Sequence, residues 1–157
     1  MTNLAGAVNV KLVDGCDLPP PHRATEGAAG FDLRSRVQID LYPGERAKVP
    51  TGYCWEIPPG SVGLVCPRSG LAINHGITVI NAPGIVDSDY RGEVCVLLVN
   101  LDTGGLNHRS PFRINVGDRI AQMVIVPVKA LATMANMTSA LQETERGDGG
   151  FGHTGTA

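Results

Sequence analysis

The segment that decides the fold is Ile77-Thr-Val-Ile-Asn-Ala-Pro-Gly-Ile-Val-Asp-Ser-Asp-Tyr-Arg-Gly-Glu-Val-Cys-Val-Leu-Leu-Val99, in which a polar connection separates two apolar runs. Both runs, Ile77–Ile80 and Val94–Val99, are rich in β-branched residues and have the length of a strand. Ala82-Pro-Gly84 interrupts the chain between them, as turns do. The segment therefore predicts two core strands joined by an exposed hairpin connection.

Similar patterns extend in both directions from this segment. Period-two alternation predicts half-buried strands, and more continuous apolar runs predict strands buried on both faces. The half-buried strands expected are Val8–Val13, Arg36–Leu41 and Arg46–Val49, and the fully buried ones are Val62–Cys66, Ile77–Ile80, Val94–Val99 and Ile120–Val126. Turns rich in Pro and Gly lie between them, at the spacing of a sandwich or barrel. The fold class expected is all-β.

Helix is expected in few places. Leu71–His75 predicts one short helical turn, with Gly76 as its C-cap. Lys129–Leu141 is compatible with either helix or irregular structure. From Glu143 the chain becomes glycine-rich, so we expect one β domain over residues 1–142 and a C-terminal arm over 143–157.

Composition excludes several classes of protein. Thirteen basic and fifteen acidic residues give a net charge of -2, which provides no broad positive field for a nucleic acid. The four cysteines form no Cys-x-x-Cys pair, which favours a reduced, cytoplasmic protein over a disulfide or zinc scaffold. The N-terminus lacks the pattern of a signal peptide, and no apolar run approaches membrane-spanning length. We expect no membrane partner.

The glycine-rich end contains Gly147-Asp-Gly-Gly-Phe-Gly152, which matches G-x-G-x-x-G only literally. No strand leads into it and only five residues follow, so neither a Rossmann unit nor a Walker A loop fits. Taken alone, the segment is typical of a mobile tail. Arg146 suits bidentate phosphate binding and Phe151 could stack on a base, so an arm that closes over a nucleotide is the second interpretation.

Two further segments have both an ordinary and a functional interpretation. Pro67-Arg-Ser-Gly-Leu71 opens the helical turn, and its hydroxyl and amides would serve either a capped turn or an anion. Asn81–Gly92 brings two carboxylates, an amide and an aromatic ring into one connection. Polar hairpins are common, but backbone groups here could meet a flat base edge while a carboxylate accepts a proton from water. We interpret Asp89 as solvated.

Five segments in this order resemble the five motifs of the trimeric dUTPases. They are Ala29-Gly-Phe-Asp-Leu33, Pro67-Arg-Ser-Gly-Leu71, Gly84-Ile-Val-Asp-Ser-Asp-Tyr-Arg-Gly92, Gly117-Asp-Arg-Ile-Ala-Gln122 and Arg146-Gly-Asp-Gly-Gly-Phe-Gly-His-Thr-Gly155. The resemblance implies a jelly-roll-like β-barrel or sandwich with a flexible glycine-rich C-terminal arm. It also implies a homotrimer with active sites shared between subunits, and Mg²⁺-dependent hydrolysis of dUTP to dUMP and pyrophosphate. Such an enzyme limits uracil in DNA and supplies dUMP for dTMP synthesis.

The resemblance also implies residue roles. Asp87 would be the general base that orients water for attack on the α-phosphorus. Asp32 would touch the water shell of Mg²⁺, which the phosphates mainly hold. The phosphate-binding residues implied are Arg68, Ser69, Gly70, Gln122, Arg146 and Gly152.

Selection of deoxyuridine would come from the hairpin. The Asn81 amide and the backbone of Gly84, Ile85 and Val86 would match the edge of uracil, with no space for the methyl group of thymine. Tyr90 would pack on the deoxyribose and exclude a 2′-hydroxyl, and Phe151 would cover the base.

Cys95 departs from the family pattern, because a longer side chain such as Met or Lys is usual there. Its backbone could still contact the base, while its side chain suits apolar packing. The related dCTP deaminases carry a catalytic Glu where this chain has Leu97, which cannot shuttle protons. A nucleotide-sensing trimer without activity is the second alternative.

Overall fold

The computed structural model describes residues 8–103, 110–129, 139, 142 and 144, and the expected all-β fold is confirmed for them. The elements in chain order are β1 (Asn9–Leu12), β2 (Gly30–Arg34), β3 (Ile39–Leu41), β4 (Arg46–Glu56), β5 (Ser61–Cys66), α1 (Ser69–His75), β6 (Ile77–Val79), β7 (Gly84–Val86), β8 (Glu93–Asn100), β9 (Phe112–Ile114) and β10 (Arg119–Pro127). Apart from residue 144, the residues expected to form the arm lie outside the described part of the chain, as do most of residues 129–141.

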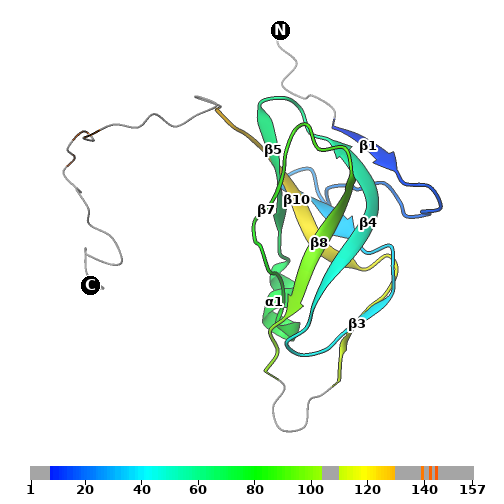
Figure 1. Ribbon diagram of the computed structural model, residues 1–157. Coiled ribbons are helices and arrows are strands. Elements are labelled where there is room, and N and C mark those ends of the chain that lie inside the picture. The colour runs from blue at the N-terminus through cyan, green and yellow to red at the C-terminus, as the bar shows by residue number, and fades with distance from the viewer. Residues whose placement is uncertain (1–7, 104–109, 130–138, 140–141, 143, 145–157) are drawn as a thin grey trace.

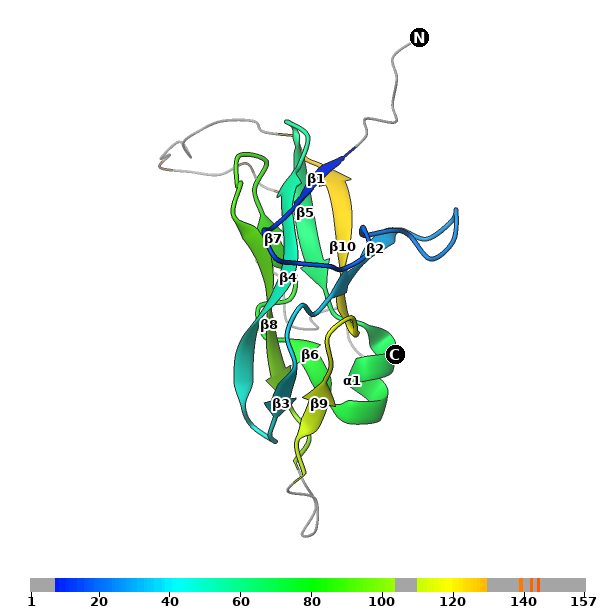
Figure 2. The same ribbon diagram turned by 90° about the vertical axis from the view of Figure 1, so that its right-hand side faces the viewer.

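Two four-stranded antiparallel sheets pack face to face (Figure 1). One has the order β1-β4-β8-β6 and the other the order β2-β10-β5-β7. Strands β3 and β9 form a separate ribbon that extends from the end of the molecule where α1 lies (Figure 2). Neighbours in each sheet are distant in sequence, as in a jelly-roll-like topology. In the part of the chain that is described, no helix has the length and apolarity needed to span a bilayer.

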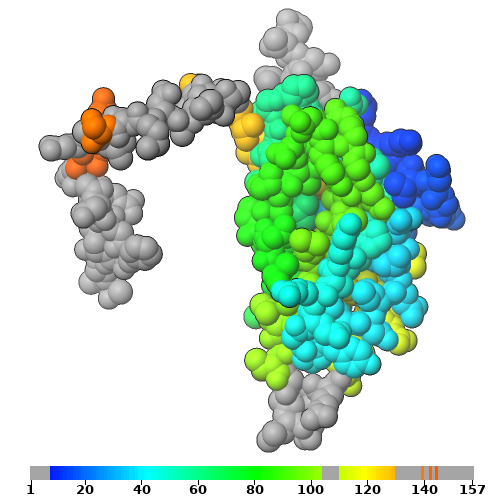
Figure 3. Space-filling view, viewed as in Figure 1, coloured from blue at the N-terminus to red at the C-terminus, as the bar shows by residue number. Residues whose placement is uncertain are grey.

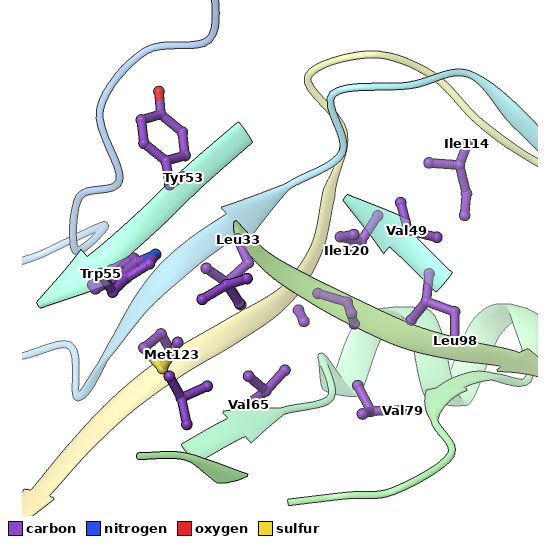
Figure 4. Packing of buried hydrophobic residues seen from close by; sticks show 14 of the residues in the cluster. Leu33, Val49, Tyr53, Trp55, Val65, Val79, Leu98, Ile114, Ile120 and Met123 are labelled. Atoms are coloured by element: carbon purple, nitrogen blue, oxygen red, sulfur yellow. The ribbon is translucent and has the colours of Figure 1, made fainter. Parts of the chain in front are cut away.

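The core lies between the two sheets and comes from the inward-facing residues of their strands other than β1. Figure 4 shows Trp55 of β4 and Met123 of β10 meeting from opposite sheets, beside Leu33 of β2. All three side chains are at most 1% exposed. Truncating a side chain this deeply buried costs about 2–5 kcal/mol. This packing holds the two sheets, and the loops that connect their strands, in a fixed arrangement.

Strand burial differs from the sequence expectation in two ways. The run Val62–Cys66 was expected to be buried on both faces, but β5 alternates between buried and partly exposed positions, since each sheet has only one covered face in the single chain. The Val8–Val13 segment was expected to be half-buried, yet every residue of β1 is exposed. β1 is an edge strand that pairs only with β4, and none of its residues belongs to the core cluster of the described chain.

Three strands, β2, β7 and β9, were not expected from the sequence, and the predicted strand Arg36–Leu41 is shortened to β3. Its first half is a turn in which the Ser35 hydroxyl donates to the Val37 carbonyl at 2.6 Å and accepts from the Val37 N–H at 3.2 Å. Such local side-chain bonds compete with strand pairing.

Helix α1 confirms the predicted turn and its end. Gly76 adopts φ 65°, in the left-handed region, and its N–H donates to the Ala72 carbonyl at 3.1 Å. A Cβ at this position would come 2.8 Å from the backbone nitrogen of Asp102. Only glycine suits both the conformation and the space.

Candidate active site

A cavity of about 260 Å³ lies between the β7–β8 connection and the outer face of β8. Its lining residues are Lys48, Val65, Asn81, Gly84, Ile85, Val86, Asp87, Tyr90, Glu93, Val94, Cys95 and Leu97. Figure 3 shows the face formed by the green residues of β7 and β8 and the cyan residues of β4, the segments that supply most of this lining. A pocket of this size lined by backbone, amide and carboxylate groups suits a small polar ring.

Strand register explains which side chains reach the cavity. In β8 the side chains of Val94, Val96 and Leu98 point into the core, so Cys95 and Leu97 point outward. Leu97 pairs with Lys48 of β4, which places the lysine beside it on the same face.

Strand β7 forms one wall of the cavity. It is the edge strand of its sheet and pairs only with β5, so its second edge has no strand partner among the described residues. Gly84 packs closely here, because a Cβ would lie 3.2 Å from both Asn81 Nδ2 and Val65 Cβ. Unpaired backbone groups next to an amide can bind a ring that has donors and acceptors on one edge.

Asp87 follows β7 directly and is exposed in the cavity. Its carbonyl accepts from the Tyr90 N–H at 3.1 Å, which closes the turn. Its carboxylate makes no hydrogen bond or ion pair with any other described residue. The carboxylate is therefore available to accept a hydrogen bond from water.

Tyr90 is 46% exposed, and two contacts hold its ring in place. Its hydroxyl donates to the Glu93 carbonyl at 3.1 Å. Its ring lies over Gly92, where a Cβ would come 2.5 Å from the hydroxyl oxygen. The ring thus stands as a side wall of the cavity.

Cys95 contributes its side chain to the cavity lining, and its thiol lies 3.7 Å from the Glu93 carbonyl as a weak donor. Burial raises the pKa of this thiol above its ordinary value, and the nearby Lys48 opposes that effect. The thiol is therefore neutral at pH 7.

The residues expected around the phosphates form a second group on β2, β5 and β10 and at the start of α1. Asp32 of β2 and Cys66 of β5 flank Gln122 of β10 in one row across three neighbouring strands. Gln122 Nε2 donates to the Pro67 carbonyl at 3.1 Å. None of these residues lines the cavity.

Two arginines surround Asp32. Arg119 Nη1 lies 3.4 Å from one carboxylate oxygen and Arg68 Nε lies 3.9 Å from the other. Arg68 also donates to the Arg119 carbonyl at 2.8 Å. Ser69 and Gly70 are exposed at the start of α1. The group is cationic overall, with an exposed hydroxyl beside it, and can bind an anion.

Within the part of the chain that the structure describes, no group of three or more His, Cys, Asp or Glu could hold a metal ion. Asp32 is the acid expected near Mg²⁺, and a carboxylate with one long contact to each arginine retains acceptor sites for a metal-bound water. It therefore fits an indirect role. Arg146, Phe151 and Gly152 lie outside the described residues.

Sequence reasoning missed Lys48 and Glu93 as lining residues. Lys48 lay in a predicted strand, where its alternation with Ala47 and Val49 placed it on the outer face. The sequence did not indicate that β8 would pair with β4 and bring that face to the hairpin. Glu93 comes directly after Gly92, the last residue of the third motif. Only its position at the start of β8 could have suggested that it lines the cavity.

Comparison with known proteins gives consistent results. The dUTPase family model matches residues 17–155. A deoxyuridine 5'-triphosphate nucleotidohydrolase of Rhizobium etli (strain CIAT 652) is 54% identical over 150 residues, covering 93% of this chain and 91% of the relative. The protein of the same name from Mycolicibacterium gilvum (strain PYR-GCK) is 50% identical over 143 residues, covering 88% of this chain and 89% of the relative.

Solved structures show the same similarity in three dimensions. The Staphylococcus bacteriophage 80alpha dUTPase with dUPNHPP superposes with a TM-score of 0.84 at 27% identity, covering 96% of this chain and 99% of that one. A mutant dUTPase from phage phi11 of S. aureus, described with a structural Mg(II) ion, gives a TM-score of 0.69 at 26% identity, covering 89% and 97%. The chain belongs to the dUTPase family.

Proposed function

We propose that the chain hydrolyses dUTP to dUMP and pyrophosphate. The observation that carries this proposal is the cavity between Asn81 and Tyr90, where an amide and a tyrosine ring meet a strand edge and a carboxylate that have no partner among the described residues. Family membership and relatives named as nucleotidohydrolases of deoxyuridine 5'-triphosphate support it.

Uracil would bind along the outer edge of β7. The Asn81 amide and the backbone groups of Gly84–Val86 can match the alternating donors and acceptors of its ring edge, and Cys95 offers a further backbone contact. A base held this closely against the backbone would leave no room for the methyl group of thymine. Tyr90 would contact the deoxyribose and clash with a 2′-hydroxyl.

Asp87 would act as the general base. A water bound to its carboxylate attacks the α-phosphorus and transfers its proton to Asp87, while the bond from that phosphorus to the bridging oxygen breaks and pyrophosphate leaves. In-line attack needs little protein chemistry beyond positioning and charge stabilisation. Proton abstraction by a positioned carboxylate contributes about 10²–10⁴ in rate.

The triphosphate would bind the cationic group around Asp32 and the start of α1. Arg68, Ser69 and Gly70 would contact the phosphates together with Gln122, and the Ser69 hydroxyl would stabilise the charge that develops on the leaving side. When bound, Mg²⁺ supplies further charge neutralisation through the phosphate oxygens. Asp32 would orient its water shell.

A homotrimer would unite the two groups. The cavity and the cationic group share no lining residue within one chain, and a neighbouring subunit would bring its cationic group beside the cavity. Large apolar side chains near each group are exposed, among them Ile85 at 60% and Ile73 at 83%. Their burial between subunits would supply the energy of association.

The C-terminal segment would complete the site from a neighbouring subunit. Arg146 would bind the γ-phosphate, Phe151 would cover the uracil and the amide of Gly152 would contact the phosphate chain. We further propose a reducing, cytoplasmic location, since all four cysteines are free thiols.

Deamination of dCTP is disfavoured because Leu97 lines the cavity where those enzymes use a glutamate. A sensing protein without activity would bind dUTP and release nothing.

The test is pyrophosphate release from dUTP, dCTP, dTTP and UTP in parallel, with and without Mg²⁺. We expect release from dUTP alone, with Mg²⁺ raising the rate. Ammonia from dCTP would identify a deaminase, tight dUTP binding without turnover would identify a sensor, and equal rates with UTP would refute the role of Tyr90.

A further inference from the structure

The Glu93 carboxylate, at the start of β8, is held by donors from two other segments. Arg36 forms an ion pair with it, with Nε 2.9 Å from Oε1 and Nη2 donating to Oε2 at 3.1 Å. The backbone N–H of Gly52 donates to Oε1 at 2.7 Å. The Arg36 and Glu93 side chains are 34% and 19% exposed, so solvent screens the pair less than an open surface pair.

The conformation and the packing of β4 are constrained at Gly52. The register between β4 and β8 shifts between Pro50 and Cys54, and Gly52 adopts φ 83° within that bulge. A Cβ there would lie 2.3 Å from Cys16 Sγ, so the bulge packs closely against the N-terminal segment. The carboxylate of Glu93 is therefore anchored to a buried and conformationally specific part of the sheet.

The backbone of Glu93 in turn holds Tyr90. Its carbonyl accepts the Tyr90 hydroxyl at 3.1 Å, and the preceding Gly92 lies beneath the ring. Tyr90 and Glu93 both line the cavity. A displacement of the Glu93 backbone would consequently move the tyrosine wall.

We propose that Glu93 is a positioning residue for Tyr90 and thereby for sugar discrimination, an inference that rests on the proposed function. Through Arg36 and Gly52, its carboxylate fixes the carbonyl that receives the Tyr90 hydroxyl. The ring then stays at the depth that admits deoxyribose and excludes ribose. Glu93 contacts no reacting atom in this role.

The test compares Glu93→Ala, Glu93→Gln and Arg36→Met with the wild type in kcat and KM for dUTP and UTP. We expect Glu93→Ala to raise KM for dUTP about tenfold, to leave kcat within about twofold and to lower the preference for dUTP over UTP about tenfold. Glu93→Gln keeps an acceptor for the Gly52 N–H and should recover part of the preference. Arg36→Met should give an intermediate loss.

Asp40→Ala is the matched control. It breaks another carboxylate–arginine pair between strands, in which Arg113 Nε and Nη2 donate to Asp40 at 2.7 and 2.8 Å, away from the cavity. This variant should change the thermal unfolding temperature without changing the preference for dUTP. On a Tyr90→Phe background, Glu93→Ala should cause little additional loss, since both changes act on the same contact.

The inference is overturned if Glu93→Gln and Arg36→Met, both folded, keep the wild-type preference, or if Glu93→Ala and Tyr90→Phe act additively. The same preference is measured from the Kd values for dUMP and UMP. A wild type that binds dUMP more tightly than UMP but releases no pyrophosphate would refute the proposed function. The role of Glu93 would still be tested by the Kd values of the variants for dUMP and UMP.

Discussion

At the residue scale, the hairpin connection gives its two aspartates different surroundings. Asp87 lines the cavity, whereas Asp89 is exposed and lies outside the lining. Two positions along a turn thus separate a carboxylate that can reach a bound molecule from one that contacts bulk water. The sequence alone left an ordinary polar hairpin open, and the motif resemblance singled out Asp87.

Cys95 provides a residue-scale prediction. Burial raises the pKa of its thiol, so the thiolate fraction near pH 8 is small. Cys95 should therefore react with iodoacetamide more slowly than the amino acid cysteine does in solution. The rate should rise as the pH passes above the ordinary range of a thiol. Bound dUMP should slow it further, since the thiol lines the cavity. Peptide mass spectrometry over time measures the rate, and Cys95→Ala identifies the modified peptide. Equal rates with and without dUMP would contradict this placement of Cys95.

At the element scale, the sequence predicted the continuous strands better than the short ones. β8 and β10 were expected because their apolar runs are long, and α1 because Gly76 ends it. β2 and β7 were missed because glycine opens both, and glycine lowers strand propensity. Their pairing with longer strands makes them strands, and pairing between distant segments is not visible in local pattern.

The end of α1 can be tested through Gly76→Ala. The left-handed conformation and the contact with the Asp102 backbone should together lower the free energy of unfolding by about 1–3 kcal/mol. Denaturant titration measures this change. Gly27→Ala is the control, because its Cβ would meet nothing within 4 Å. Equal stability of the two variants would contradict the described helix end.

The ion pair that joins β3 to β9 should make the stability of the protein depend on pH. The hydrogen bond from Arg113 holds the pKa of Asp40 below its ordinary value of 3.8. A lowered pKa in the folded state contributes stability that is present above pH 3.8 and is lost as the pH falls through the folded value. The unfolding temperatures of the wild type and Asp40→Asn should therefore differ at pH 7 and converge in acid. A difference that stays constant down to pH 2 would contradict the pairing.

At the scale of the whole molecule, the separation of the cavity from the cationic group is the main finding. The motif resemblance predicted which residues belong to a site, but it did not show that, within one chain, none of the cationic group lines the cavity. Residues 143–157 were assigned to a closing arm, and that assignment stays a prediction.

Subunit mixing tests the shared site. Asp87→Asn and Arg68→Ala should each be nearly inactive as pure assemblies. When unfolded together and refolded at equal amounts, about a quarter of the sites should combine an intact Asp87 with an intact Arg68 from a neighbour, as a cyclic assembly with random mixing requires. Sedimentation should give a trimer throughout. Mixtures that stay as inactive as their components would contradict the shared site.

Truncation after Gln142 tests the arm. The shortened chain should keep the trimer and the unfolding temperature, because every residue of the core found among the described residues precedes the removed segment. Its kcat/KM for dUTP should fall by at least about a hundredfold, since a closing segment both binds phosphate and excludes water. Full activity after truncation would refute this role.

The most direct test of the account is the Asp87→Asn variant, measured for dUTP binding by calorimetry and for pyrophosphate release on the same preparation. The substitution keeps the shape of the side chain and removes the proton acceptor. We predict a Kd within about threefold of the wild type and a kcat lower by about 10²–10⁴. A variant that turns over dUTP at the wild-type rate would contradict the central claim that Asp87 activates the attacking water.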